Sequence, residues 1–114
     1  MRHTEDYLQM QCIKWFDLQY PKILRHHSPN GGKRNAREGK RFKNMGTLAG
    51  FPDLFIIHGN NLYHGLFIEM KADKGKQQTT QKSFQVKVEN IGYKYIVCRS
   101  FDEFKREIEK YLGL

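Results

Sequence analysis

Two short apolar segments joined by turn-forming residues constrain the fold of this chain more than any other feature. Residues 53–57 read Asp-Leu-Phe-Ile-Ile, residues 58–61 read His-Gly-Asn-Asn, and an apolar run returns over 62–71. Short runs of β-branched and aromatic residues, bounded by Gly and Asn, are typical of a β-hairpin. Folding about Asn60 and Asn61 sets Asp53 opposite residue 68, one position from Glu69. The hairpin therefore brings two carboxylates close together.

The segments around this hairpin predict three helices and a third strand. Thr4 begins a first helix, with Glu5 at the head of its apolar stripe and a body that ends near residue 18. A second helix is predicted over about 80–90, with Gln81 on its buried side, and a third from the capping box at Ser100. A strand over 93–98 separates these two. The order predicts an α/β fold in which a small mixed β-sheet is flanked by α-helices, and 114 residues suit one domain, 1–114.

Basic residues are concentrated in one segment. Lys and Arg outnumber Asp and Glu by 20 to 12, and the stretch from Arg25 to Lys43 contains a single acid, Glu38. The pattern over 33–45 is weakly helical and ends at Gly46, so we expect residues 25–46 to form a mobile basic flap. Such a segment favours binding to a polyanion. A solvated loop that serves only solubility is an equal alternative for a charge run taken alone.

The sequence also limits location and redox chemistry. No run approaches the roughly 18 apolar residues of a spanning helix, and the polar residues 1–6 do not resemble a signal peptide. We expect a cytoplasmic protein of a bacterial or phage-infected host cell, with no membrane partner. Cys12 and Cys98 lie in apolar periodic segments, which predicts buried free thiols instead of a disulfide. The histidines show no zinc-ligand spacing.

Two neighbouring buried carboxylates are costly through desolvation and mutual repulsion, and a divalent cation removes this conflict. Oxygen ligands suit Mg²⁺ or Mn²⁺, which can activate water and stabilise a phosphate in its transition state. Lys71 points to the same strand face as Glu69 and could orient or deprotonate that water. When the Glu-x-Lys motif is considered alone, an ordinary salt bridge of Lys71 with Asp53 or Glu69 at a sheet end is the favoured explanation, because the motif is common by chance.

The combination of motifs is more specific. Gly50-Phe-Pro-Asp53 followed one strand later by Glu69-Met-Lys71 resembles the PD-(D/E)XK nuclease superfamily, with its restriction-endonuclease-like core. Glu5, the Pro29–Gly32 turn, Gln81 and Gly92-Tyr93 make the chain similar, more narrowly, to the VRR-NUC family over nearly its whole length.

This resemblance implies a metal-dependent endonuclease that hydrolyses DNA phosphodiester bonds. It implies that Glu5, Asp53, Glu69 and the backbone carbonyl of Met70 bind Mg²⁺ or Mn²⁺, and that Asp53, Glu69, Lys71 and Gln81 form the catalytic group, with Gln81 in support. DNA then becomes the expected partner of the flap. The basic residues expected to contact it are Lys33, Arg34, Arg37, Lys40, Arg41 and Lys43.

Stand-alone members of the family resemble Holliday-junction resolvases, which implies a homodimer acting on branched DNA in repair. Apolar residues outside the expected core could form the dimer interface or complete the monomer core, and these readings are equal at this stage. They are Phe51, Leu62, Tyr63 and Leu66. Two alternatives to a junction resolvase are a flap or single-strand nuclease and a non-catalytic DNA-binding module that uses the basic segment.

Overall fold

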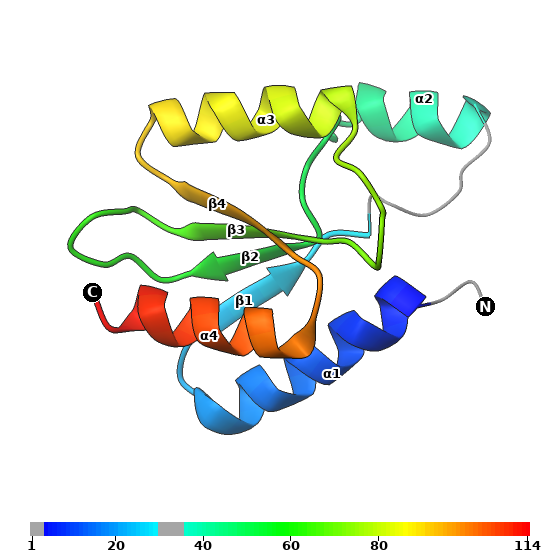
Figure 1. Ribbon diagram of the computed structural model, residues 1–114. Coiled ribbons are helices and arrows are strands. Elements are labelled where there is room, and N and C mark those ends of the chain that lie inside the picture. Colours follow the sequence, from blue (N-terminus) through cyan, green and yellow to red (C-terminus); the bar gives the residue numbers. More distant parts are fainter. Residues whose placement is uncertain (1–3, 30–35) are drawn as a thin grey trace.

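The computed structural model describes residues 4–29 and 36–114, and it is an α/β structure with one small sheet (Figure 1). The helices are α1 (Thr4–Gln19), α2 (Ala36–Asn44), α3 (Thr79–Asn90) and α4 (Phe101–Leu112). The strands are β1 (Leu24–His27), β2 (Leu54–Ile57), β3 (Leu66–Met70) and β4 (Lys94–Cys98). The predicted fold class, a small mixed sheet flanked by helices, is confirmed.

The sheet has four strands in the order β1-β2-β3-β4. The first two pairings are antiparallel, and β3 pairs with β4 in parallel. A parallel pair needs a crossover connection, and α3 supplies it between β3 and β4. Every residue of β3 is buried, as expected for a central strand covered on both faces. Figure 1 shows α3 on one face of the sheet and α1 with α4 on the other.

Each face of the sheet has its own apolar cluster. Cys12 and Phe16 of α1 pack with Phe104 and Ile108 of α4 against the inner residues of β2 and β3, and all four are fully buried. On the opposite face Phe84 and Val88 of α3 pack against Phe67 and Tyr95. Because both faces are covered, polar side chains that function must collect at an end of the strands, where the helices begin.

Local signals place the helix ends as predicted. Ser100 Oγ accepts a hydrogen bond from the Glu103 backbone N–H at 3.1 Å, which caps α4. The Glu103 carboxylate accepts a hydrogen bond from the backbone N–H of Arg99 at 2.7 Å, whereas in a capping box it would accept from Ser100, one residue later. Gly46 follows α2 with a φ of 109°, the left-handed conformation that ends many helices. The N-cap at Ser100 and the stop at Gly46 are thus both present, whereas the reciprocal half of the capping box is displaced to Arg99.

Strand β1 corrects the prediction of a flap over residues 25–46. Arg25, His26 and His27 pair with Ile56, Phe55 and Leu54 of β2, so the start of the expected flap is an edge strand. Arg25 also forms a 2.6 Å ion pair with Asp17 of α1, which removes it from the freely available basic charge. Residues 36–44 are helical, as expected.

The hairpin has a register one residue away from the predicted one. Leu54 pairs with Ile68, so Asp53 lies across from Glu69 itself. The cause is the turn: Asn60 N–H donates to Tyr63 O at 2.9 Å, and the Asn60 side chain accepts from the N–H groups of Leu62 and Tyr63. The returning strand therefore begins at Leu66 and not at Leu62.

Three of the four apolar residues that could have formed a dimer interface complete the monomer core. Leu66 is fully buried, Tyr63 packs against the α1–α4 cluster and Phe51 packs against the α3 cluster. Leu62 is exposed. These residues therefore give a homodimer less support than expected.

Two further expectations concern the cysteines and the membrane. Cys12 and Cys98 are buried free thiols, as predicted, and burial raises the pKa of each to about 12. In residues 4–29 and 36–114, none of the helices has the length and apolar character that crossing a bilayer requires.

Candidate metal and catalytic site

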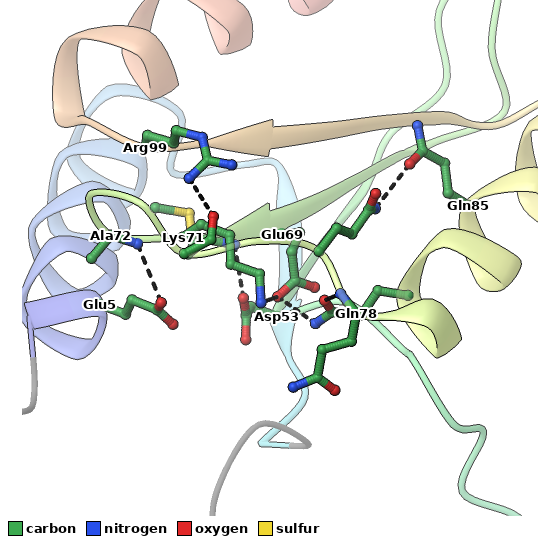
Figure 2. Close-up of polar contacts among 12 residues, drawn as sticks. Glu5, Asp53, Glu69, Lys71, Ala72, Gln78, Gln85 and Arg99 are labelled. Atoms are coloured by element: carbon green, nitrogen blue, oxygen red, sulfur yellow. Dashed lines mark hydrogen bonds and ion pairs between the residues drawn. The ribbon is translucent and has the colours of Figure 1, made fainter.

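Asp53 and Glu69 meet at one end of the sheet (Figure 2). Asp53 precedes β2, and Glu69 lies across from it in β3, where only 3% of its surface is exposed. Asp53 Oδ2 accepts a hydrogen bond from the backbone N–H of Met70 at 2.8 Å, which fixes its carboxylate beside β3. The structure thus brings together the two acids that the hairpin pattern predicted.

Lys71 and Gln81 converge on the same carboxylate. Lys71 Nζ lies 3.7 Å from Glu69 Oε2, and the Lys71 side chain is buried. Gln81, in the first turns of α3, donates from Nε2 to the same oxygen at 2.9 Å. Its own Oε1 accepts from the backbone N–H of Gln78 at 2.7 Å, so the amide orientation is fixed at both ends. All four predicted catalytic side chains therefore form one contiguous group.

Burial and charge act strongly on Glu69. Burial, followed by the negative charge of Asp53, raises the pKa of Glu69 to about 8 from its ordinary value of 4.5, and the Lys71 ammonium offsets only part of this. Glu69 Oε1 is buried and has no hydrogen-bond partner among the described residues. A buried carboxylate oxygen without a partner beside a second carboxylate is an arrangement that a cation would stabilise.

The backbone of Asp53 is held from the opposite side by β1. Asp53 O accepts from the backbone N–H of Ser28 at 2.9 Å and lies 3.0 Å from His27 Nδ1. The same ring nitrogen lies 2.9 Å from Nε2 of Gln9 in α1. A strand that sequence reasoning read as part of a loop thus fixes one of the two central acids.

Gly50 lets the segment before Asp53 press against the start of α3. Its φ is 79°, and a Cβ at this position would lie 2.2 Å from the backbone O of Thr80. No side chain fits at that distance. Glycine therefore allows the close approach that sets Asp53 and Gln81 beside the same carboxylate, and it accounts for the Gly50 of the recognised motif.

Glu5 lies beside this group but does not touch the two acids. Its side chain is exposed, and Oε2 accepts a hydrogen bond from the backbone N–H of Ala72 at 3.2 Å (Figure 2). Among residues 4–29 and 36–114, no three His, Cys, Asp or Glu side chains are grouped closely enough to hold a metal ion. The Ala72 contact uses only Oε2 of Glu5, so the carboxylate can still offer its other oxygen to a cation, and its ligand role remains a prediction.

The donor set at this end of the sheet suits Mg²⁺ or Mn²⁺. Asp53 and Glu69 supply carboxylate oxygens, including the buried Oε1 that has no partner in the described chain. These hard oxygen ligands are the ones that small divalent cations prefer. Met70 is the last residue of β3, directly after Glu69, and the role of its backbone carbonyl as a further ligand also remains a prediction.

The basic residues expected to bind DNA divide between helix α2 and the undescribed segment. Lys33 and Arg34 lie outside the described residues. The other four are exposed on α2: Arg37, Lys40, Arg41 and Lys43. Helix α2 is joined to Asp53 by a short segment in which Gly50 lies against Thr80 at the start of α3, so the chain leads from the basic helix directly to the end of the sheet that holds the carboxylates.

Arg99 is a residue near the site that sequence reasoning missed. Arg99 directly follows β4, and its Nη1 donates to the backbone carbonyls of Asp73 at 3.1 Å and Gly75 at 2.6 Å. Figure 2 shows Arg99 beside this turn. Asp73 has a φ of 43°, a conformation that few non-glycine residues adopt, and Arg99 stabilises the turn around it. This turn follows Lys71 directly. An isolated arginine after a strand gives no signal from which such a contact could be predicted.

Comparisons with known proteins agree with this geometry. A model of the VRR-NUC domain matches residues 3–102. A solved structure described as a VRR_NUC domain protein is similar with a TM-score of 0.84 and 33% sequence identity, over 97% of this chain and 89% of that chain. A search of curated proteins found no match. Because the family match spans most of the residues and the solved relative shares the fold over nearly its whole length, this chain belongs to the VRR-NUC domain family, whose domains are of a nuclease type that processes DNA.

Proposed function

We propose that this protein is a Mg²⁺- or Mn²⁺-dependent DNA endonuclease that hydrolyses phosphodiester bonds. The observation that carries the proposal is the pairing of Asp53 with the buried Glu69. One oxygen of Glu69, Oε2, contacts Lys71 and Gln81, and the other, Oε1, has no hydrogen-bond partner in the described chain. A non-catalytic DNA-binding module would gain nothing from these acids, because without a cation they repel the phosphates that α2 attracts.

In the proposed mechanism, a divalent cation held by Asp53 and Glu69, with Glu5 and the Met70 carbonyl as further ligands, would activate water and neutralise charge on the phosphate. Lys71 lies beside Glu69, where its ammonium would orient the attacking water and the phosphate. Only the neutral amine of Lys71 could accept the water proton, which otherwise passes to solvent, and the departing ester oxygen takes up a proton from solvent. The water oxygen forms a bond to phosphorus in line with the departing ester oxygen, and that P–O bond breaks. Gln81 keeps Glu69 in place throughout, since its amide is bound at both ends.

We further propose that the substrate is branched DNA and that a homodimer makes paired cuts, as stand-alone relatives resembling Holliday-junction resolvases would. The competing activity is that of a flap or single-strand nuclease. The direct test is cleavage of a labelled four-way junction, a flap, a duplex and a single strand with Mg²⁺, with Mn²⁺ and with chelator, together with the solution mass.

We expect symmetric paired nicks in the junction by a dimer, and no cleavage with chelator. Scattered cuts in a flap or single strand by a monomer would leave a nuclease but reject the junction proposal. Cleavage that persists in chelator would contradict the metal dependence, and DNA binding without any cleavage would favour the binding module.

Changes at Arg37 and Arg41 should weaken DNA binding without touching the chemistry. Each alanine substitution removes one exposed charge from α2, so we expect the slope of log affinity against log salt to fall by about one phosphate contact per residue. The measurement is a salt titration of binding to a labelled junction in calcium or chelator, where cleavage does not interfere.

The matched control removes two exposed lysines, Lys87 and Lys110, at the far ends of α3 and α4 (Figure 1). This control changes net charge equally and should leave affinity and slope nearly unchanged. If Arg37→Ala and Arg41→Ala bind like the wild type, α2 is not the DNA-binding helix.

A further inference from the structure

Tyr95 carries a buried hydroxyl that the proposed mechanism does not use. The residue is 5% exposed, and its hydroxyl has no hydrogen-bond partner within the described part of the chain. Two side-chain atoms of the described residues share this condition, and the other is Oε1 of Glu69. Buried polar atoms are paired in the great majority of cases, so each exception needs an explanation. Here one atom is a hydrogen-bond donor and the other an acceptor.

The sheet places these two side chains on the same face. Tyr95 pairs with Phe67 and Val97 pairs with Glu69 across the parallel strands, so Tyr95 lies diagonally from Glu69, two positions along β4. Alternate residues of a strand point to one face, and a tyrosine is long enough to reach a diagonal neighbour. The face is the one that α3 covers, because Tyr95 packs with Phe67 and Phe84.

The surroundings of the hydroxyl agree with this placement. Burial raises the pKa of Tyr95 most, the side chain of Gln77, which is close but not in hydrogen-bonding geometry, lowers it, and the negative charges of Glu69 and Asp53 raise it further. A phenol carries its proton at neutral pH, so the hydroxyl of Tyr95 can donate a hydrogen bond.

Only one oxygen of Glu69 is held by the residues already described. Oε2 accepts from Gln81 and lies near Lys71, while Oε1 has no such contact. A carboxylate that accepts one hydrogen bond at each oxygen still has lone pairs for a cation. We propose that Tyr95 is a positioning residue of the site, whose hydroxyl donates to Glu69 Oε1 in the metal-loaded protein and fixes the plane of that carboxylate. This inference rests on the proposed nuclease function.

The test compares Tyr95→Phe with Tyr111→Phe. Tyr111 is equally buried, but its hydroxyl donates to His58 O at 2.7 Å, in the core below the sheet. Partners of ligating carboxylates typically contribute a factor of 10 to 100, so we expect Tyr95→Phe to weaken Mn²⁺ binding and lower kcat by roughly that factor with KM for DNA unchanged. In chelator its urea midpoint should equal or exceed that of the wild type, because the lost hydroxyl had no partner.

Tyr111→Phe should show the reverse: a lower urea midpoint, because His58 O loses its donor, with Mn²⁺ affinity by calorimetry and kcat unchanged. If Tyr95→Phe binds Mn²⁺ and cleaves DNA within about twofold of the wild type, the inference is overturned and the nuclease proposal stands. A Tyr95→Phe protein that loses urea stability as Tyr111→Phe does, with unchanged metal affinity, would also overturn it. If the wild type itself neither binds Mn²⁺ nor cleaves DNA, the proposed function fails, and the inference fails with it.

Discussion

Replacement of Lys71 by alanine is expected to lower DNA cleavage to less than about 1% of the wild-type rate, because the loss of one group that stabilises transition-state charge typically costs a factor of 10² to 10³. Lys71 Nζ lies 3.7 Å from Glu69 Oε2 in a buried position, where its charge is little screened by water. DNA affinity should change little, because the exposed charges of α2 remain. The measurement is single-turnover cleavage of the preferred substrate with saturating Mn²⁺.

Two companion variants make this result specific. Lys71→Met keeps most of the buried side-chain volume and should be as inactive as Lys71→Ala, which separates the ammonium from packing. Lys74→Ala removes an exposed lysine from the turn that follows and should retain activity. If Lys71→Met cleaves at the wild-type rate, the role of Lys71 is to compensate the charge of Glu69 in the fold, and another group activates the water.

Asp53→Asn should also abolish cleavage. The remaining side-chain oxygen can still accept the hydrogen bond from Met70 N–H, so the fold is kept, while the negative charge that would hold the cation is lost.

Glu69→Gln is expected to stabilise the metal-free protein at alkaline pH. The folded-state pKa of Glu69 is raised from 4.5 to about 8, so between these values the folded protein keeps a proton that the unfolded chain has lost. The free energy of unfolding of the wild type should therefore fall as pH rises through this window, whereas glutamine stays neutral. By pH 8.5 in chelator we expect Glu69→Gln to be more stable by roughly 2–4 kcal/mol, since each pKa unit corresponds to about 1.4 kcal/mol and the desolvation of the glutamine amide offsets part of the gain.

Metal should reverse this trend. A cation that binds only the folded wild type adds about 2.7 kcal/mol at a hundredfold excess over its Kd, and the glutamine variant should gain little. Urea unfolding at pH 5 and 8.5, with chelator and with Mn²⁺, measures both effects. Glu109→Gln, an exposed change on α4, serves as the control and should show neither. If the free energy of unfolding depends on pH in the same way in the wild type and in Glu69→Gln, the charge of Glu69 is fully compensated in the fold and needs no cation.

The sequence predicted those parts of the site that depend on short-range patterns. Asp53 and Glu69 could be paired because a strand alternates its side chains and a hairpin brings neighbouring strands together. Gln81 could be placed on α3 from helical periodicity. Even so, the register was wrong by one residue, because the side chain of Asn60 closes a turn that two-residue hairpin rules do not describe.

The parts that could not be predicted depend on tertiary packing. Strand β1 reads Leu-Arg-His-His, which has neither apolar alternation nor length, and it forms because β2 offers it an edge. Glu5 was assigned to the inward stripe of α1, but its side chain is exposed, and periodicity does not give the distance between a helix end and a sheet end. Its contact with Ala72 spans 67 residues of sequence, and so does not follow from any local rule.

The position of Glu5 also bears on how the site opens. The buried residues of α1, Cys12 and Phe16, lie in its second half, whereas Glu5 is in the first turn, which is exposed. Helix ends fray at little cost compared with whole helices, so the first turn can release Ala72 while the rest of α1 stays packed. Native-state hydrogen exchange should then find the Ala72 amide poorly protected beside the well-protected amides of β3. The site would thus combine a rigid half, held by the sheet, with a half that can exchange partners without unfolding the protein.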